Sequence, residues 1–541
     1  MTTRMMKLTV WGLVGALTGI VPLSAQQAPV QAPTTPQTAP QGNVAPGSTM
    51  NQYVVGQAKP PETGAPRLDL TMDDVINLAL EHNLDLQVAK LNPQIQDYSL
   101  QQARAVYRPT MTSQFGYNNA QSQSTSTIEG GTVISSTTQT YNAGATQLLP
   151  WGENFTFSFG NTRSYTSAST SSFNPSLRAS MSFNVTQSLL QGRKTDQTRT
   201  NLKMLDYTRQ VTDLTLKALI ADTIAQVRDA YWDLRSSIEQ IEITKQTLAL
   251  AQKLVEDNNA KVTVGTLAPL DVLSAQSAVA QQQVTLANNV STWQTRELAL
   301  KRLIVGGTDD DVYKATINPV DRLDVTKVTP DIPGAITTAL GQRTDLVSAK
   351  LNLSKTELNL RLLEDQVKPS LNLTGGYSLS GVGGPQLSRT SITGTVTDTI
   401  PGGYLDALGR LQQNPTWNVN FNLSYPLGQV AARASLASNR LSFEQAKTQI
   451  KVTEFTISTA VTNAALAVQN GYIALQASSV SRDLAERTAA AEQSKFEVGL
   501  STNYNVVQAL NDLNSARLSE LNQMISYIKA LIEYERVQAV G

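Results

Sequence analysis

Alternating apolar and polar residues predict several β-strands. The clearest segment is Trp417–Leu427, in which aromatic and aliphatic residues alternate with asparagine and serine. A period of two places the apolar residues on one face of a strand and the polar residues on the other. Four further segments alternate in the same way: Pro109–Asn119, Asn154–Ser164, Leu177–Gln187 and Ser370–Ser380. The alternation in Thr138–Leu148 is weaker. The uncharged polar faces fit either a soluble sandwich or a membrane barrel with a wet lumen.

Two very long helices follow from the absence of helix-breaking residues. Residues 195–261 contain neither proline nor glycine, and residues 429–498 contain only Gly471. At about 1.5 Å per residue, each helix would be about 100 Å long. Each is followed by a short break and a second helix, Pro269–Ile304 or Asn503–Val540. Helices of this length need partners packed along them, as in coiled coils. Shorter helices, Leu70–Asn83 and Asp85–Val106, are expected before the first strand, with Thr71 capping the first of them.

The two halves of the chain repeat one pattern. Ile76–Leu80 resembles Ile336–Leu340 at an offset of 260 residues, and the Pro109 and Pro369 that follow the next helix keep this offset. The turns containing Val264-Gly265 and Val498-Gly499 match at an offset of 234. Each half therefore predicts helices, strands, a long helix, a turn and a returning helix. The smaller second offset means about 26 extra residues in the first half, which we assign to a strand pair around 138–164.

Glycine has a physical role in both turns. Gly265 and Gly499 can adopt the left-handed conformation that commonly ends a helix. We expect Thr266 or Thr502 to cap the helix that follows, and Pro269 to occupy its first turn.

The composition argues against catalysis and against nucleic-acid binding. The 541 residues carry no net charge, no cysteine and one histidine, His82. Zinc–thiolate sites and cysteine nucleophiles are therefore excluded, and a Ser–His triad has little support. No basic stripe is present to bind nucleic acid. We predict no enzyme activity, no cofactor and no metal site, and we interpret the acidic Thr308–Asp311 as a solvated turn.

The N-terminus resembles a secretion signal. Arg4 and Lys7 precede an apolar run, Leu8–Leu23, and Ala25 is a suitable cleavage site. No later segment reaches about 18 uninterrupted apolar residues, so no later membrane-spanning helix is expected. Residues 26–67 are rich in Pro, Gln and Ala and predict a disordered linker. Export from the cytoplasm favours the membrane barrel over the sandwich.

These patterns give an α+β fold with an internal two-fold repeat. The expected parts are a signal peptide at 1–25, a linker at 26–67, a first repeat at 68–305, a connector at 306–333 and a second repeat at 334–541.

At this point the chain resembles the TolC-like outer-membrane efflux protein family. The resemblance rests on the order and duplication of five features: the Leu70–Asn83 helix, Arg108-Pro109 with Lys368-Pro369, Tyr425-Pro426-Leu427-Gly428, Val264-Gly265, and Val498-Gly499-Leu500. It implies a homotrimer in the outer membrane, with long helices forming a periplasmic α-barrel. It also implies four strands per subunit in one shared twelve-stranded transmembrane β-barrel. The implied partners are a periplasmic adaptor and an inner-membrane pump.

The resemblance also assigns roles to residues. The tips carrying Val264, Gly265, Val498, Gly499 and Leu500 would dock the adaptor. Asp271 matches a family aspartate near the periplasmic gate, and Asn505 is its counterpart in the second half. A solvated helix N-terminus would equally favour Asp271. Trp417 and Tyr425 would be aromatic residues at the interface between barrel and lipid.

An open sheet edge in lipid costs several kcal/mol per unpaired backbone group, so four strands require an oligomer. Two readings remain beside an efflux duct: a pore-free coiled-coil scaffold and a type I secretion component. The extra strand pair would either extend outside the membrane or lengthen the barrel wall.

Overall fold

A computed structural model describes residues 58–62, 64–125, 127–129, 131–323, 325–391 and 394–539. All of them belong to one compact unit, Val54–Gly541. The expected signal peptide and most of the expected linker lie outside the described residues. Near the end of the expected linker, Ala58 is buried and its N–H donates to Glu239 Oε1 at 3.4 Å.

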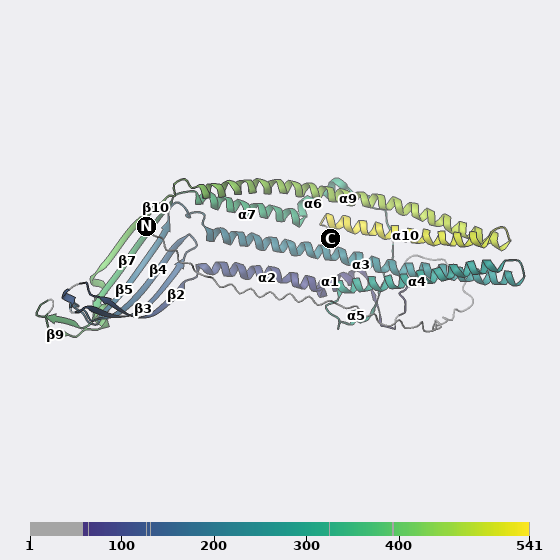
Figure 1. The fold of residues 1–541 in the computed structure, drawn as a ribbon. Helices are drawn as coiled ribbons and strands as arrows, with labels where there is room; N and C mark the ends of the chain where they lie inside the picture. The colour runs from purple at the N-terminus through teal and green to yellow at the C-terminus, as the bar shows by residue number, and fades with distance from the viewer. Residues whose placement is uncertain are drawn as a thin grey trace, which may run out of the picture. The chain divides into compact units, whose positions relative to one another are not determined.

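Two long helices dominate the fold and confirm the prediction from the sequence. They are α3 (Gln197–Thr263) and α9 (Val430–Glu497), of 67 and 68 residues. Helix α4 (Pro269–Ile304) returns along α3, and α10 (Asn503–Val537) returns along α9 (Figure 1). The other half of each long helix packs against α2 (Leu84–Arg104) or α7 (Thr344–Gln366). Each long helix thus gains partners along its length.

The repeat is preserved in the bounds of the elements. Helix α1 (Met72–His82) corresponds to α6 (Ile332–Gln342) at the predicted offset of 260, and Thr71 caps α1 in a capping box. Helices α1 and α6 pack on their long helices through separate apolar clusters. Tyr231 and Trp293 are almost fully buried in the first cluster, while Ile457 and Val461 hold the second.

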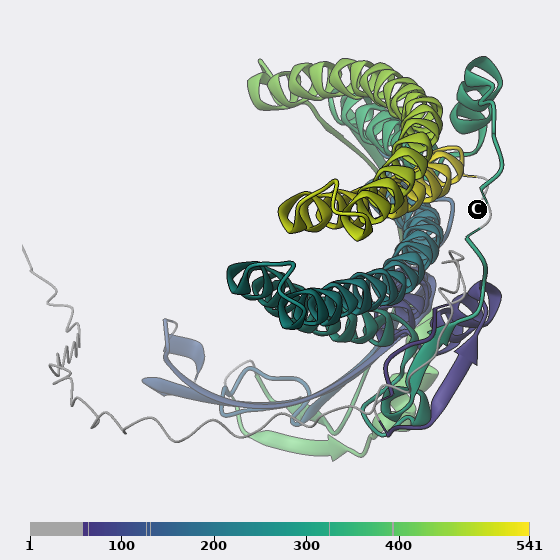
Figure 2. The ribbon, with the colours of Figure 1, turned by 90° about the vertical axis from the view of Figure 1, so that its right-hand side faces the viewer.

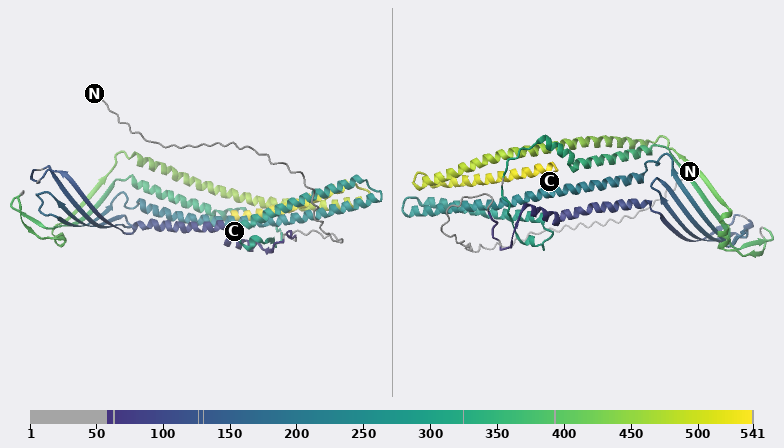
Figure 3. Two further views of the ribbon diagram at one scale, coloured as in Figure 1. Left: turned by 60° about the horizontal axis from the view of Figure 1, so that its bottom comes forward. Right: turned by 180° about the vertical axis from the view of Figure 1, so that it is seen from behind.

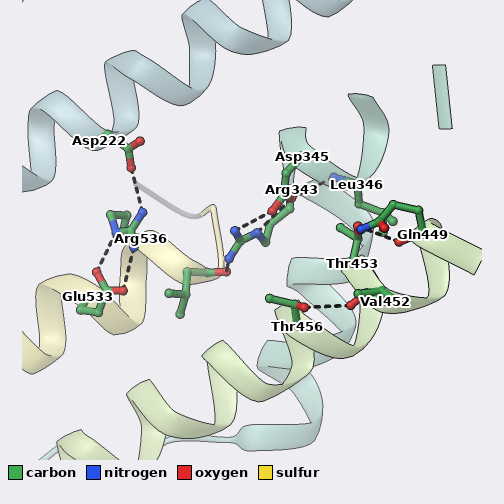
Figure 4. Close-up of polar contacts among 11 residues, drawn as sticks. Asp222, Arg343, Asp345, Leu346, Gln449, Val452, Thr453, Thr456, Glu533 and Arg536 are labelled. Atoms are coloured by element: carbon green, nitrogen blue, oxygen red, sulfur yellow. Dashed lines mark hydrogen bonds and ion pairs between the residues drawn. The ribbon is translucent and has the colours of Figure 1, made fainter. Parts of the chain in front are cut away.

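The end of α10 meets the start of α7 (Figure 4). Arg343, which precedes α7, donates to Asp345 Oδ2 at 2.7 Å and to the main-chain oxygen of Val537 at 3.4 Å. Arg536 donates to Asp222 of α3 at 2.8 Å and to Glu533 of its own helix. Arg343 thus connects the start of α7 to the end of α10, and Arg536 connects the end of α10 to α3.

Six antiparallel strands form one sheet in the order β10-β7-β5-β4-β3-β2. Their bounds are β2 (Thr110–Gln123), β3 (Val133–Leu148), β4 (Glu153–Thr166), β5 (Ser176–Ser188), β7 (Ser370–Gly383) and β10 (Pro415–Ser424). All six predicted strands are confirmed. The sheet has two strands more than the four that the resemblance implies for each subunit, because the extra pair, β3 and β4, lies within it.

Smaller elements connect these parts. A parallel pair of β1 (Arg67–Leu70) and β6 (Thr316–Pro319) was not predicted, since four residues are too few to show a period. Past β7 lie β8 (Gln386–Arg389), β9 (Val396–Ile400) and α8 (Tyr404–Gly409), with η3 (Leu411–Gln413). The short helices η1 (Ala105–Tyr107), η2 (Thr127–Glu129) and α5 (Asp311–Lys314) complete the described part. Of the acidic residues at 309–311, Asp309 lies in a turn, Asp311 begins α5, and Asp310 caps it by accepting from the N–H of Val312 at 2.9 Å.

Candidate functional site: the hairpin tips and the two-faced sheet

The tips of the two hairpins lie at the end of the helices away from the sheet (Figures 1 and 3). We define the first tip as residues 264–268 and the second tip as residues 498–502. Gly265 and Gly499 both have positive φ, 72° and 79°. In each tip two backbone hydrogen bonds close the end of the long helix: Gly265 N to Val262 O, Thr266 N to Lys261 O, Gly499 N to Phe496 O, and Leu500 N to Lys495 O. This is the Schellman arrangement, and it confirms the role predicted for the glycines.

The threonine caps were predicted correctly for one tip and wrongly for the other. Thr502 accepts from Asn505 N and caps α10. Ala268 occupies the capping position of α4, and Pro269 begins that helix. Thr266 instead donates its hydroxyl to Lys261 O at 3.0 Å. The offset of 234 pairs Thr502 with Ala268 rather than with Thr266, which explains the error.

Both tips expose large apolar side chains. Val264 is 73 % exposed and Val498 is 71 % exposed, at equivalent positions of the repeat. Leu270, Leu273, Leu500 and Tyr504 are also exposed beside them. Apolar groups gathered at a protein surface commonly mark an interaction site. The five tip residues singled out in the sequence are therefore well placed for docking a partner.

Polar contacts beside the two tips connect the hairpins. Figure 2 shows the molecule from the side of the tips. Asn258 and Asn503 are both buried, and Asn258 Nδ2 donates to Asn503 Oδ1 at 2.7 Å. Lys261 Nζ donates to Phe496 O at 2.8 Å and lies 3.7 Å from the centre of the Phe496 ring. The equivalent Lys495 contacts Glu492 in its own helix instead. No local pattern in the sequence predicts these contacts, since they join residues 245 and 235 positions apart.

The gate residues of the sequence analysis lie beside this junction. The main-chain oxygen of Asp271 accepts from Asn503 Nδ2 at 3.1 Å. Asn505 is exposed, and its N–H and side-chain amide donate to Thr502 and Ser501. The structure thus joins Asp271 to Asn503 rather than to Asn505. The side chain of Asp271 is half-buried in the first turn of α4, where an acidic group is favourable.

A groove of about 380 Å³ lies between α3 and α9 behind the tips. Its lining includes Leu254, Phe496 and Val506 from the apolar cluster that packs the two hairpins together. Charged residues of both long helices, Lys253, Asp257 and Glu497, also line it. Apolar and charged groups are therefore both accessible next to the two tips.

At the other end of the fold, the sheet has two distinct faces. The strand register aligns Trp417, Tyr377, Phe183, Phe157, Ala145 and Met111 in one row across all six strands. The next row, on the opposite face, holds Thr416, Ser378, Ser182, Ser158, Gly144 and Thr112. Trp417 is 74 % exposed, and Tyr425 is exposed one residue past β10. An exposed apolar face of this extent is atypical of a surface in water.

Among the described residues, none of the helices is both long and apolar enough to cross a bilayer. In the same part of the chain, no three His, Cys, Asp or Glu residues are grouped as they would be around a metal ion.

Comparisons with known proteins agree with this geometry. The sequence model of the family described as "Outer membrane efflux protein" matches residues 147–306 and 335–534. The chain is similar to Nodulation protein T of Rhizobium leguminosarum bv. trifolii, with 22 % identity over 342 residues. That match spans 62 % of this chain and 64 % of the relative, so it covers less than two thirds of the relative's length.

Solved structures share the fold. The outer-membrane channel OprN matches with a TM-score of 0.63 and 15 % identity, covering 87 % of this chain and 90 % of that one. The MtrE outer membrane channel of Neisseria gonorrhoeae matches with a TM-score of 0.57 and 16 % identity, covering 91 % and 97 %.

Proposed function

Because this chain belongs to the outer membrane efflux protein family, we propose that it is one subunit of an outer-membrane channel that forms the exit duct of a tripartite efflux pump. The observation that carries the proposal is the two-faced sheet, which is continuous with helices about 100 Å long. An apolar face suits lipid, and a face of Asn, Ser and Thr suits a wet lumen. The role is transport, without catalysis.

The sheet supports an oligomer. Strands β2 and β10 form its two edges, and nearly all their residues are exposed. In lipid, edge groups without partners would each cost several kcal/mol. Pairing β2 of one copy with β10 of the next removes that cost. We propose three copies, the number implied by the resemblance to the TolC-like family.

The helices would then extend into the periplasm and end at the tips. Val264, Gly265, Val498, Gly499 and Leu500 are proposed to dock a periplasmic adaptor, which links the channel to an inner-membrane pump. Support comes from the repeated exposed valines, since the same surface is offered twice per subunit. Asp271 and Asn505 are proposed to lie at the gate, and Trp417 and Tyr425 at the boundary between the sheet and lipid.

A deletion strain tests the export role. Loss of the gene is expected to increase sensitivity to several small toxic compounds, and the unaltered gene should restore resistance. Unchanged sensitivity together with loss of one secreted protein would instead support a type I secretion role. Recovery of the protein from the periplasmic soluble fraction would support the scaffold reading and contradict the channel.

A further inference from the structure

The extra hairpin of the first repeat is built into the middle of the sheet. Strands β3 and β4 lie between β2 and β5. The register pairs β2 with β3 from Thr110↔Thr146 to Gln123↔Val133, and β4 with β5 from Glu153↔Gln187 to Ser164↔Ser176. Because β3 pairs along β2 and β4 pairs along β5, strands β2 and β5 do not contact each other. A wall of four strands per subunit would require that contact.

The two faces of the sheet continue through this hairpin without interruption. Phe155, Phe157 and Phe159 of β4 lie in the rows of Val185, Phe183 and Met181 of β5. The rings of Phe157 and Phe183 lie 4.9 Å apart. On the opposite face, Ser158 and Ser182 hydrogen bond at 2.6 Å. A hairpin standing outside the membrane has no need of an apolar band at the same level as its neighbours.

The turn between β3 and β4 lies at the helix end of the sheet. It is tight: Leu149 N donates to Glu153 O at 2.8 Å, and Gly152 has a φ of 96°. Trp151 in this turn is 57 % exposed, as Tyr425 is exposed at the same end of β10. Aromatic residues are enriched where a membrane protein meets the lipid headgroups. This turn therefore resembles the periplasmic margin of a membrane sheet.

The strand directions allow closure. All neighbours in the six-stranded sheet are antiparallel, and six is an even number. Strands β2 and β10 therefore run in opposite directions, and copies placed edge to edge form antiparallel pairs throughout.

We propose that residues 133–166 add two strands per subunit to the transmembrane wall, so that three copies close a barrel of eighteen strands. The proposal rests on the trimer of the proposed function. Barrel diameter grows roughly linearly with strand number, so this outlet is about 1.5 times as wide as a twelve-stranded one. The hairpin tips, and not the outlet, then limit the size of what passes.

Disulfide trapping tests the position of the hairpin, because the chain has no cysteine of its own. Gln114 of β2 and Asn142 of β3 are paired, and their side-chain amides lie 3.5 Å apart. Ser180 of β5 lies in the same row but three strands from Gln114, which is about 14 Å at ordinary strand spacing. That distance is too long for a disulfide.

The double variant Gln114→Cys/Asn142→Cys is expected to form an intrachain disulfide on mild oxidation of outer membranes. The control Gln114→Cys/Ser180→Cys is expected to stay reduced. Failure of the first pair to form, whatever the control does, overturns the placement of β3 beside β2. A bond in the control pair would mean that β2 contacts β5 and that the wall has four strands per subunit.

Electron cryomicroscopy of the purified full-length oligomer in lipid nanodiscs then counts the strands. Eighteen strands in a trimer support the proposal, and twelve strands with an external hairpin overturn it. An oligomer that is absent from the outer membrane, or that has no barrel, would instead contradict the proposed function itself.

Discussion

Asn258 of α3 donates its side-chain amide to Asn503 at the start of α10, at 2.7 Å, and both residues are buried. Asn503 in turn donates to the main-chain oxygen of Asp271 at the start of α4. One buried asparagine thus connects both hairpins of the chain at the level of the tips. In the proposed channel, this connection would be part of what keeps the periplasmic entrance closed.

Removing the Asn258 amide should loosen the entrance. Asn258→Ala leaves the buried Asn503 side chain without this partner, at a cost of about 1–3 kcal/mol. We expect a larger resting conductance of the purified channel in planar bilayers. Asn259→Ala is the matched control, because the neighbouring Asn259 is exposed. Equal conductance in both variants would show that the Asn258–Asn503 contact does not keep the entrance closed.

The charge of Asp271 should matter if this residue faces the pore. Asp271→Ala is expected to lower cation selectivity and change single-channel conductance, since three copies would remove three negative charges from the entrance. Asn505→Ala, which changes no charge, should leave selectivity unaltered. If Asp271→Ala changes neither conductance nor selectivity, Asp271 does not act at the gate. Its side chain then only stabilises the N-terminus of α4.

Adaptor docking should depend on the apolar tip residues. The double variant Val264→Asp/Val498→Asp is expected to assemble as a trimer but to leave cells as sensitive to exported compounds as the deletion strain. Ala268→Asp adds the same charge to the first tip at the capping position of α4, where Asp is favourable. Full resistance in the double variant would exclude the valines from docking.

Asp229 should reduce stability at neutral pH. Burial raises the pKa of its carboxyl, and Oδ1 has no hydrogen-bond partner in the described part of the chain. Because the folded-state pKa is above the unfolded one, the cost is present at neutral pH and disappears as the pH falls through the folded pKa. Asp229→Asn is therefore expected to raise the melting temperature at pH 7, with a smaller difference in acid.

Asp233 provides a control, because its replacement by Asn should not raise the melting temperature at pH 7. Its carboxylate pairs with Arg296 at 3.0 Å and with Lys529 at 2.7 Å. Asp233→Asn weakens both pairs and should not stabilise the protein at pH 7. If Asp229→Asn and Asp233→Asn change the melting temperature alike at both pH values, burial of Asp229 is not the cause.

Much of the fold could be predicted because its signals are local or repeated. Five of the six strands alternate clearly, and the near absence of Pro and Gly indicates α3 and α9. The repeat predicted equivalent tips, and both Gly265 and Gly499 have the expected positive φ. Each of these features depends on residues close in sequence, or on two copies of one pattern.

Features that depend on distant residues could not be predicted. The pairing of β1 with β6 joins two short strands about 249 residues apart. Alternation does not determine the position of β3 and β4 inside the sheet, because it defines a strand's faces and not its neighbours. The Asn258–Asn503 contact was missed for a similar reason, since a buried polar pair leaves no periodic signal in either helix.

The most direct test of the channel is its conductance after extraction. The full-length protein should be recovered from outer membranes as a heat-sensitive trimer and should open ion-conducting pores in planar bilayers, with a larger conductance for Asn258→Ala. A folded trimer that conducts no ions, in both the unaltered protein and this variant, would contradict the account.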